Sequence, residues 1–172
     1  MRVVAGELGG RRLLSPPRGS DVRPTSDRVR EALFSMLGDV ADASVLDLFC
    51  GTGALGVEAL SRGAASCVFV DSAIGPAHRN VAALDLAGRA KLVRADALEY
   101  LGREGPSFDL ILCDPPYRLA RRIGPELANA LPPRLAEGGR IVIESAADEP
   151  VDLDVQADRE RRYGETLLRI YG

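Results

Sequence analysis

The sequence predicts an α/β fold with a doubly wound, mostly parallel sheet. Short apolar runs alternate with amphipathic stretches from residue 44 onward, which is the pattern of successive βαβ units. A glycine-rich turn links the first apolar run to the helix after it, as in many sheets of this kind. Apolar residues make up 46% of the 172 residues, which is enough for the core of one such domain.

An N-terminal piece precedes this alternation. Residues 2–5 and 11–14 are short apolar or mixed runs separated by glycines, and they predict a β-hairpin. The next segment contains three prolines and a glycine, so we expect a loop there. A helix is then expected from Thr25 or Ser26 to Gly38, because apolar residues recur at helical spacing.

The expected strands of the main part are apolar runs without turn residues. They are residues 45–49, 66–71, 90–94, 108–113 and 140–144. The helices that follow them are expected at about residues 53–62, 73–87, 97–101 and 120–131. No crossover helix separates residues 151–156 from residues 167–171, so we expect an antiparallel hairpin that closes the sheet, with its turn near Gly164.

The charged residues are distributed unevenly. The whole chain has a formal net charge of −3, whereas its first 38 residues contain seven arginines and four acidic residues. Such a patch can bind RNA phosphates with salt-sensitive affinity, although it could also be a solvated surface. We expect an RNA-binding extension, residues 1–38, and a main domain, residues 39–172. The candidate RNA-binding residues are Arg2, Arg11, Arg12, Arg23, Arg28 and Arg30.

The cysteines and the histidine favour a reduced protein without a metal site. Cys50, Cys67 and Cys113 are widely spaced and lie near expected strands, and His78 is the only histidine. This usage is typical of buried thiols in a cytoplasmic protein. No apolar run approaches the roughly 20 residues of a membrane span, and the N-terminus lacks the pattern of a signal peptide. We therefore expect a cytoplasmic location and no membrane contact.

The stretch from Phe108 to Tyr117 is the strongest candidate for a functional site. Its apolar half predicts a strand buried on both faces of the sheet. The sequence Asp-Pro-Pro-Tyr then ends the strand, because prolines cannot donate to a ladder and stiffen the turn. Asp114 and the carbonyl of Pro115 are acceptors that suit an amino group, and Tyr117 suits a flat ring stacked on it. The alternative is an ordinary strand-to-loop turn.

A second constellation follows the first strand. Gly51, Gly53 and Gly56 have the Gly-x-Gly-x-x-Gly spacing, which allows a ligand to approach the backbone closely. Asp71 ends the second strand, twenty residues beyond Gly51, where a carboxylate binds ribose hydroxyls. These features alone suit a dinucleotide as well as S-adenosylmethionine.

Two further carboxylates distinguish these ligands. Asp47 lies inside the first strand, where it would repel a pyrophosphate but attract an ammonium group. Asp96 follows the third strand, where it can accept from an adenine amino group. With Asp71 and Asp114, four acids meet at one edge of the sheet, which favours a cationic sulfonium ligand over a pyrophosphate. Each acid alone could instead be a helix cap.

At this point the sequence resembles a known family. The motifs Asp47–Gly56, Asp71, Asp96 and Asp114–Tyr117 are similar to those of class I S-adenosylmethionine-dependent amino-methyltransferases with a Rossmann-like sheet. Three more stretches resemble RsmD-type 16S rRNA guanine-N(2)-methyltransferases. They are Arg2–Gly6 with Gly10–Leu13, Arg23–Phe34, and Arg162–Thr166.

The resemblance implies a function and a set of binding residues. The activity would be that of a 16S rRNA (guanine(966)-N(2))-methyltransferase, acting as a monomer on an assembled or nearly assembled small ribosomal subunit. The cofactor would be S-adenosyl-L-methionine, and the catalytic residues would be Asp114, Pro115 and Tyr117. The residues that would bind the cofactor are Asp47, Phe49, Gly51, Thr52, Gly53, Asp71, Asp96, Ala97 and Asp114.

Three other functions fit parts of the sequence. A DNA adenine or cytosine amino-methyltransferase can share Asp-Pro-Pro-Tyr, but no insertion here is long enough for a target-recognition domain. A NAD(P)-dependent oxidoreductase can share the glycine-rich turn, but no residue suits a hydride-transfer site. A non-catalytic RNA-binding assembly factor could keep the whole fold.

Overall fold

The structure of the protein is a computed structural model that describes residues 1–15 and 25–172. A loop was expected after residue 14, and almost all of it lies outside the described residues. The RNA-binding candidate Arg23 also lies outside them. Within them, no helix combines the length and apolar character needed to cross a membrane. The same residues contain no cluster of three or more side chains able to hold a metal ion.

Within the described parts of the chain, seven strands form one mixed sheet. They are β1 (Ser44–Leu48), β2 (Ser66–Asp71), β3 (Ala90–Arg94), β4 (Phe108–Cys113), β5 (Leu135–Ala146), β6 (Arg159–Tyr163) and β7 (Thr166–Tyr171). Their order is β3-β2-β1-β4-β5-β7-β6. The first five strands are parallel, and β7 pairs antiparallel with both β5 and β6. The predicted doubly wound, mostly parallel fold is therefore confirmed.

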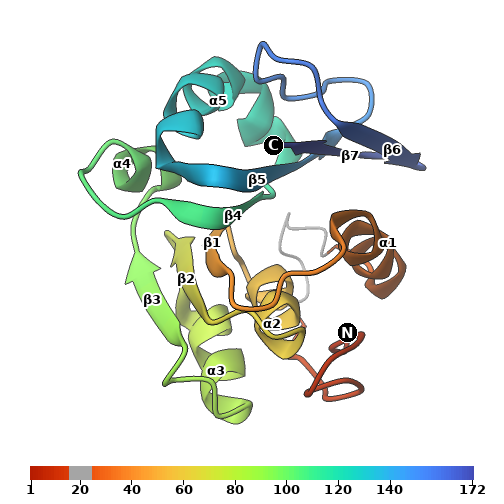
Figure 1. Cartoon of the computed structure of the whole chain (residues 1–172), viewed down its shortest axis with the longest axis vertical. Coiled ribbons are helices and arrows are strands. Elements are labelled where there is room, and N and C mark those ends of the chain that lie inside the picture. The colour runs from red at the N-terminus through yellow and green to blue at the C-terminus, as the bar shows by residue number, and fades with distance from the viewer. Residues whose placement is uncertain (16–24) are drawn as a thin grey trace.

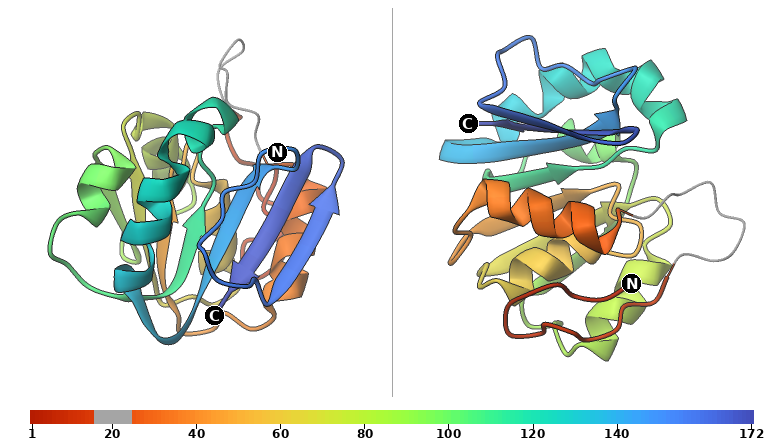
Figure 2. Two further views of the ribbon diagram at one scale, coloured as in Figure 1. Left: turned by 90° about the horizontal axis from the view of Figure 1, so that it is seen from above. Right: turned by 90° about the vertical axis from the view of Figure 1, so that its right-hand side faces the viewer.

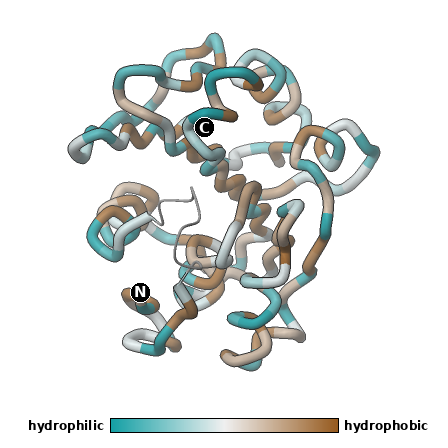
Figure 3. Tube along the Cα trace, turned by 180° about the vertical axis from the view of Figure 1, so that it is seen from behind, coloured by the Kyte–Doolittle hydropathy of each residue, from teal (hydrophilic) through white to brown (hydrophobic). Residues whose placement is uncertain are grey.

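The helices cover both faces of the sheet (Figures 1 and 2). They are α1 (Asp27–Leu37), α2 (Ala54–Ser61), α3 (Gly75–Ala83), α4 (Ala97–Leu101) and α5 (Tyr117–Ala130), with a short 3-10 turn at Pro132–Arg134. α1, α2 and α3 pack on one face, and α4 and α5 on the other. Figure 3 shows hydrophobic residues gathered towards the middle of the chain trace.

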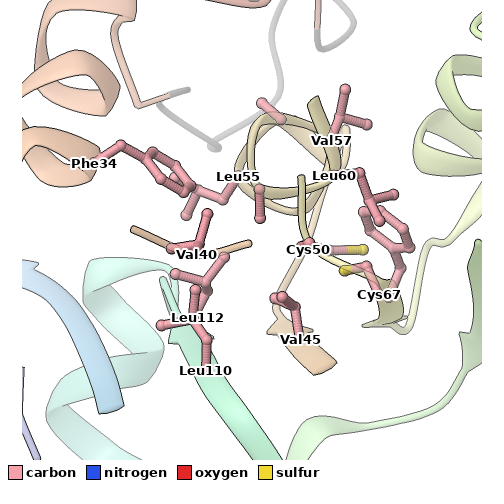
Figure 4. Close-up of a cluster of buried hydrophobic side chains, with 14 of the residues drawn as sticks. Phe34, Val40, Val45, Cys50, Leu55, Val57, Leu60, Cys67, Leu110 and Leu112 are labelled. Carbon is pink, nitrogen blue, oxygen red and sulfur yellow. The ribbon is translucent and has the colours of Figure 1, made fainter. Parts of the chain in front are cut away.

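The central strands supply the core because their side chains alternate between the two faces. On β4, Leu110 and Leu112 pack under α1 and α2 (Figure 4), whereas Ile111 and Cys113 pack under α4 and α5. All four side chains are buried. A strand apolar on both faces is what a two-layer helical cover requires.

The C-terminal hairpin differs in part from the prediction. Its turn lies near Gly164 as expected, but β6 is its first strand and residues 151–156 are outside the sheet. Val151 and Leu153 are buried beside α5, which explains their apolar spacing. β6 is an edge strand whose residues are mostly exposed and charged. It therefore lacks the apolar alternation by which a strand is recognised in a sequence.

The N-terminal hairpin is shorter than predicted and packs directly on α2. It consists of one antiparallel bridge between Arg2 and Arg12 with a few backbone hydrogen bonds beside it. The backbone N–H groups of Val4 and Ala5 donate to the buried carboxylate of Glu58, at 2.7 and 3.0 Å. The N-terminal residues thus share a core with the main domain, and the division at residue 38 remains a prediction about function.

Candidate active site

A cavity of about 840 Å³ opens at the carboxyl edge of the parallel strands. The loops after β1, β2, β3 and β4 line it, together with Thr25 just before α1 and Glu144 near the end of β5. Ligands bind at this edge in open α/β sheets, where the strand order reverses. Here the reversal falls between β1 and β4, at the centre of the cavity.

The glycine-rich loop between β1 and α2 forms one wall of the cavity. Gly51 and Gly53 have φ angles of 54° and 77°, in the left-handed region that favours glycine. Phe49 has a φ of 56°, which is uncommon for a bulky residue and marks a tightly constrained turn. At Gly56 a Cβ atom would lie 2.4 Å from the ring of Phe69. The glycines therefore allow both the sharp turn and the close packing of α2 on β2.

The three carboxylates beside this loop are held by backbone N–H groups. Asp47 accepts from Gly56 at 2.9 Å, and Asp71 accepts from Gly51 at 2.9 Å. Asp96 caps α4 through Oδ1, which accepts from the first turn of that helix at 2.9 and 3.1 Å. All three residues line the cavity. The predicted acidic edge and the alternative role as a helix cap therefore coexist at Asp96.

Burial dominates the electrostatics of Asp47. The residue is 1% exposed. Desolvation raises the pKa of Asp47 to about 7; the N–H of Gly56 opposes this shift and the charge of Asp71 adds to it. A buried carboxylate without a cation is unfavourable, so this position favours a positively charged ligand group.

The remaining residues predicted to bind the cofactor also lie on or next to this wall. Phe49, Thr52 and Ala97 line the cavity, whereas Gly53 shapes the loop behind it. The carbonyl of Thr52 accepts from the amide of Asn80 at 2.8 Å, which ties the loop to α3. The structure thus brings the predicted cofactor-binding residues to one place.

The Asp-Pro-Pro-Tyr segment forms the opposite wall. β4 ends at Cys113, and α5 begins at Tyr117 directly after the two prolines. Asp114, Pro115 and Tyr117 all line the cavity. The hydroxyl of Tyr117 lies 2.9 Å from that of Thr166 on β7, so the C-terminal hairpin fixes the aromatic ring.

Two residues that the sequence analysis did not identify complete this wall. The hydroxyl oxygen of Thr25 lies 3.0 Å from Oδ2 of Asp114 and 3.0 Å from Oε2 of Glu144. Burial, followed by the charge of Glu144, raises the pKa of Asp114 well above its usual range. One sequence signal for Glu144 existed, since it is an acid at the carboxyl end of an apolar strand. Thr25 carried no signal beyond its position near a helix start.

The predicted RNA-binding arginines fall into two groups. Arg2, Arg11, Arg12 and Arg28 are exposed. Arg30 was expected to bind phosphate, but the structure places it in the interior with 0% exposure. Its guanidinium donates to the backbone carbonyls of Thr25 and Arg2 and to Asp27. Arg30 is therefore a structural residue, because both terminal nitrogens of its guanidinium bond within the protein and its side chain is closed to solvent.

Comparison with known proteins extends the likeness to the whole chain. The family model described as "Conserved hypothetical protein 95" matches residues 1–172. Ribosomal RNA small subunit methyltransferase D of Escherichia coli strain K12 is 37% identical over 180 residues, covering 99% of this chain and 89% of that protein. The chain belongs to the RsmD family. The family resemblance seen in the sequence is therefore confirmed.

Solved structures support the same assignment. An Escherichia coli structure described as the methyltransferase yhhF is 36% identical and has a TM-score of 0.85, covering 99% of this chain and 96% of that chain. An RNA methyltransferase from Salinibacter ruber, solved in complex with S-adenosyl-L-homocysteine, is 16% identical with a TM-score of 0.66. That match covers 87% of this chain and 92% of the other, and at this identity it shows the shared fold alone.

Proposed function

We propose that this RsmD-family protein transfers a methyl group from S-adenosyl-L-methionine to the exocyclic amine of a guanine in 16S rRNA. The family leads us to expect the N(2) position of guanine 966. The observation that carries the proposal is one cavity with an acid-lined glycine-rich loop on one wall and Asp-Pro-Pro-Tyr on the other. The first wall suits a cationic cofactor, and the second wall suits a planar base that presents an amino group.

The charged side chains that line the cavity fit the cofactor. Among the described residues, the cavity is lined by one arginine, Arg118, and by five acidic residues, Asp47, Asp71, Asp96, Asp114 and Glu144. This excess of negative charge attracts a ligand that carries a sulfonium and an ammonium group and repels a pyrophosphate. When bound, S-adenosylmethionine supplies a methyl group activated by a positively charged sulfur.

Each carboxylate of the first wall has a distinct partner on that cofactor. Asp47 would bind the ammonium group, and Asp71 would bind the ribose hydroxyls. Asp96 would accept from the adenine amino group through Oδ2, since Oδ1 caps α4. Gly51 and Gly53 would let the ligand approach the backbone of the loop.

The second wall orients the target amine. The lone pair of a guanine amine is delocalised into its ring, so the amine is a poor nucleophile. We propose that Asp114 and the carbonyl of Pro115 accept its two N–H bonds, which favours a pyramidal nitrogen with its lone pair aimed at the methyl group. Tyr117 stacks on the extruded base, which contributes about 1–3 kcal/mol. Orientation of this kind accounts for much of the rate enhancement.

We further propose that the exposed arginines of the N-terminal extension bind RNA phosphates. The substrate would be the small ribosomal subunit, assembled or nearly so, and the protein would act in the cytoplasm as a monomer. Charge reversal at Arg11, Arg12 and Arg28 should weaken subunit binding and reduce its salt dependence. Arg103 is a suitable control, since it is exposed just after α4 and paired with Glu99.

The test of the function is methyl transfer onto small subunits that lack the modification. Radiolabelled S-adenosylmethionine should label these subunits, and mapping should place the label on the N(2) atom of one guanine. Label on duplex DNA instead would favour a DNA amino-methyltransferase. Tight binding of NAD(P) with no S-adenosylmethionine binding would favour an oxidoreductase. Binding of the protein to the subunit without any methylated product would favour a non-catalytic assembly factor.

A matched pair of variants links the activity to the cavity. Asp114→Ala removes the carboxylate at the cavity end of β4, whereas Asp109→Ala removes one at the start of the same strand. Asp109 is exposed and bonds to Ser44, far from the cavity edge. Loss of transfer in the first variant and retention in the second is the result expected for a site at the carboxyl edge.

A further inference from the structure

Three segments of the chain meet at the wall that carries Asp-Pro-Pro-Tyr, which we call the target wall. The hydroxyl of Thr25, just before α1, lies 3.0 Å from Oδ2 of Asp114. Tyr117 is the first residue of α5, and its hydroxyl lies 2.9 Å from that of Thr166, at the start of β7. The starts of α1 and α5 and the turn between β6 and β7 therefore lie together at this wall.

The starts of α1 and α5 each carry an exposed arginine close to the target wall. Arg28 lies three residues after Thr25, in the first turn of α1. Arg118 directly follows Tyr117 and lines the cavity. Both arginines are exposed, so each guanidinium can meet a ligand at the mouth of the cavity.

A third arginine lies on β6, at the outer edge of the sheet. β7 is antiparallel to both β5 and β6, so β6 runs in the direction of β5 and ends at the same edge. Leu168 on β7 pairs with Glu144 on one side and with Arg161 on the other. Paired residues of neighbouring strands project to the same face, and two strand spacings amount to about 10 Å. Arg161, which is exposed, thus lies at the level of Glu144, and Glu144 lines the cavity.

The packing of α1 brings Arg28 and Arg161 to the same end of the molecule. α1 lies beside β6 and β7 (Figure 2). Arg159, at the start of β6, donates to the carbonyl of Met36, near the end of α1. The end of β6 therefore lies towards the start of α1, where Arg28 is found. We call Arg28, Arg118 and Arg161 the rim arginines.

The charges of the rim arginines are not cancelled by their neighbours. Two of the three directly follow an acidic residue, and both acids are already paired. Asp27 bonds to Arg30 at 2.8 Å, and Glu160 bonds to Arg169 at 2.7 Å. Within the described parts of the chain, no hydrogen bond or ion pair engages the guanidinium of any rim arginine. Such a surface fits an anionic partner.

The proposed substrate brings phosphate groups to this surface. A guanine that stacks on Tyr117 is extruded from its strand, so the adjoining phosphates stay at the mouth of the cavity. The acids that line the cavity repel a phosphate, so the approach of the strand requires cations at the mouth. A guanidinium binds phosphate through two parallel N–H donors. The rim arginines supply such donors beside the target wall.

We propose that the rim arginines bind the phosphates on either side of the target guanine and hold the RNA strand while its base enters the cavity. This inference rests on the proposed function, and it adds a binding surface on α5 and β6 to the arginines of the N-terminal hairpin. Arg162 is not part of the surface, since its Nε holds the turn by donating to the carbonyl of Gly164 at 2.8 Å.

The first test measures binding of the protein to small subunits over a range of salt concentrations. Arg118→Ala and Arg161→Ala should each weaken binding roughly tenfold at low salt, the lower end of the worth of a charged hydrogen bond, because both side chains are exposed. Replacing all three rim arginines with alanine should reduce the slope of log affinity against log salt by about 2, since each phosphate contact on a single strand contributes about 0.7.

Two of these variants have a matched control on the same element. Arg121 on α5 is paired with Glu149, and Arg159 on β6 donates to α1. Arg121→Ala and Arg159→Ala should therefore bind subunits within about twofold of wild type. Equal losses in the rim variants and the controls would overturn the proposal, because a general loss of positive charge would explain them. Weaker binding of S-adenosylmethionine by Arg118→Ala would also overturn it, since Arg118 would then contact the cofactor.

The second test locates the contact on the RNA by hydroxyl-radical footprinting of small subunits. The wild-type protein should protect the backbone on both sides of the target guanine. The triple alanine variant, at a concentration that saturates the subunits, should lose these protections and keep those that depend on Arg11 and Arg12. Protections by the variant that match those of wild type would overturn the proposal. Weakened binding to subunits with unchanged binding to protein-free 16S rRNA would also overturn it, since the partner would be a ribosomal protein.

These results separate the inference from the proposed function. Normal methylation by a wild-type protein that does not protect the backbone beside the modified guanine would overturn the inference alone. A wild-type protein that protects RNA through the rim arginines but methylates no guanine would contradict the proposed function, while the binding surface would stand.

Discussion

The two walls of the cavity are built in different ways. On the cofactor wall, each carboxylate is held by backbone N–H groups of its own neighbourhood; the partners of Asp96, Asp47 and Asp71 lie at most 20 residues away. On the target wall, Asp114 is held by a hydroxyl 89 residues away. The cofactor wall is therefore assembled from contacts that are short in sequence, whereas the target wall depends on segments that are far apart in the chain.

This difference determines how far the effect of a substitution should reach. A carboxylate of the cofactor wall is bonded to backbone close to it in sequence, so its replacement should disturb mainly its own loop. Asp114 is linked through the hydroxyl of Thr25 to the segment before α1 and to Glu144 on β5. Substitutions in those distant segments should therefore also affect the target wall.

The largest expected effect is on the target wall. Asp114→Ala should reduce turnover by roughly 10²–10⁴-fold, equivalent to about 3–5 kcal/mol of barrier, while cofactor affinity stays close to wild type. Single-turnover methylation of small subunits and calorimetric titration of the cofactor measure the two quantities separately. Asp114→Asn, which keeps the shape and one acceptor oxygen, should retain more activity than the alanine variant. Wild-type turnover by Asp114→Ala would mean that the turn has only a structural role.

The next effect concerns Asp47 and the stability of the free protein. The folded-state pKa of about 7 lies above the ordinary value of 3.8, so the folded protein binds more protons than the unfolded chain between these pH values. Stability should therefore fall as pH rises from about 4 to 7. Asp47→Asn removes this penalty and should raise the free energy of unfolding by up to about 4 kcal/mol at pH 8.

The control for this prediction is pH itself. At pH 3.5 the carboxyl is protonated in the folded protein and mostly protonated in the unfolded chain, so Asp47→Asn and wild type should have nearly equal stability. Urea unfolding at the two pH values provides the comparison. Equal stability of the two proteins at pH 8 as well would show that the buried carboxylate carries no such penalty. The variant should also bind S-adenosylmethionine more weakly, because the ammonium group loses its charged partner.

A smaller effect is expected at Asp71. Asp71→Ala should weaken cofactor binding by about 1.5–3 kcal/mol per lost charged hydrogen bond and should also loosen the loop, since Gly51 loses its acceptor. Asp71→Asn keeps an acceptor for Gly51 but loses the charge, so it separates these contributions. Calorimetry of both variants gives the affinities. An unchanged affinity of Asp71→Ala for S-adenosylmethionine would show that Asp71 does not contribute to cofactor binding.

The smallest effect is expected for the hydroxyl of Tyr117. Tyr117→Phe loses the hydrogen bond to Thr166 and should cost about 0.5–1.5 kcal/mol, seen as a modest rise in KM for the subunit. Tyr117→Ala should cost more, because it also removes the stacking ring. A loss of kcat in Tyr117→Phe as large as that in Asp114→Ala would show that the hydroxyl takes part in the reaction.

Local signals in the sequence were sufficient for the fold class and for the cofactor wall. The alternation of strand and helix depends on periodicity within ten or twenty residues, and parallel strands bring their carboxyl ends to one edge. The glycine spacing, Asp47, Asp71 and Asp96 could therefore be placed together from the sequence. The Asp-Pro-Pro-Tyr turn was also recognisable, because prolines end a strand for reasons within the turn itself.

Tertiary structure alone decided the rest. Arg30 is charged and was expected at the surface, but the backbone carbonyls of Thr25 and Arg2 accept from its terminal nitrogens in the interior. β6 has no apolar alternation and is a strand only because β7 offers it an edge. Thr25 and Glu144 join Asp114 because the segment before α1 and the end of β5 meet at the end of β4. Contacts of such sequence separation depend on how whole elements pack, and no local pattern of residues encodes them.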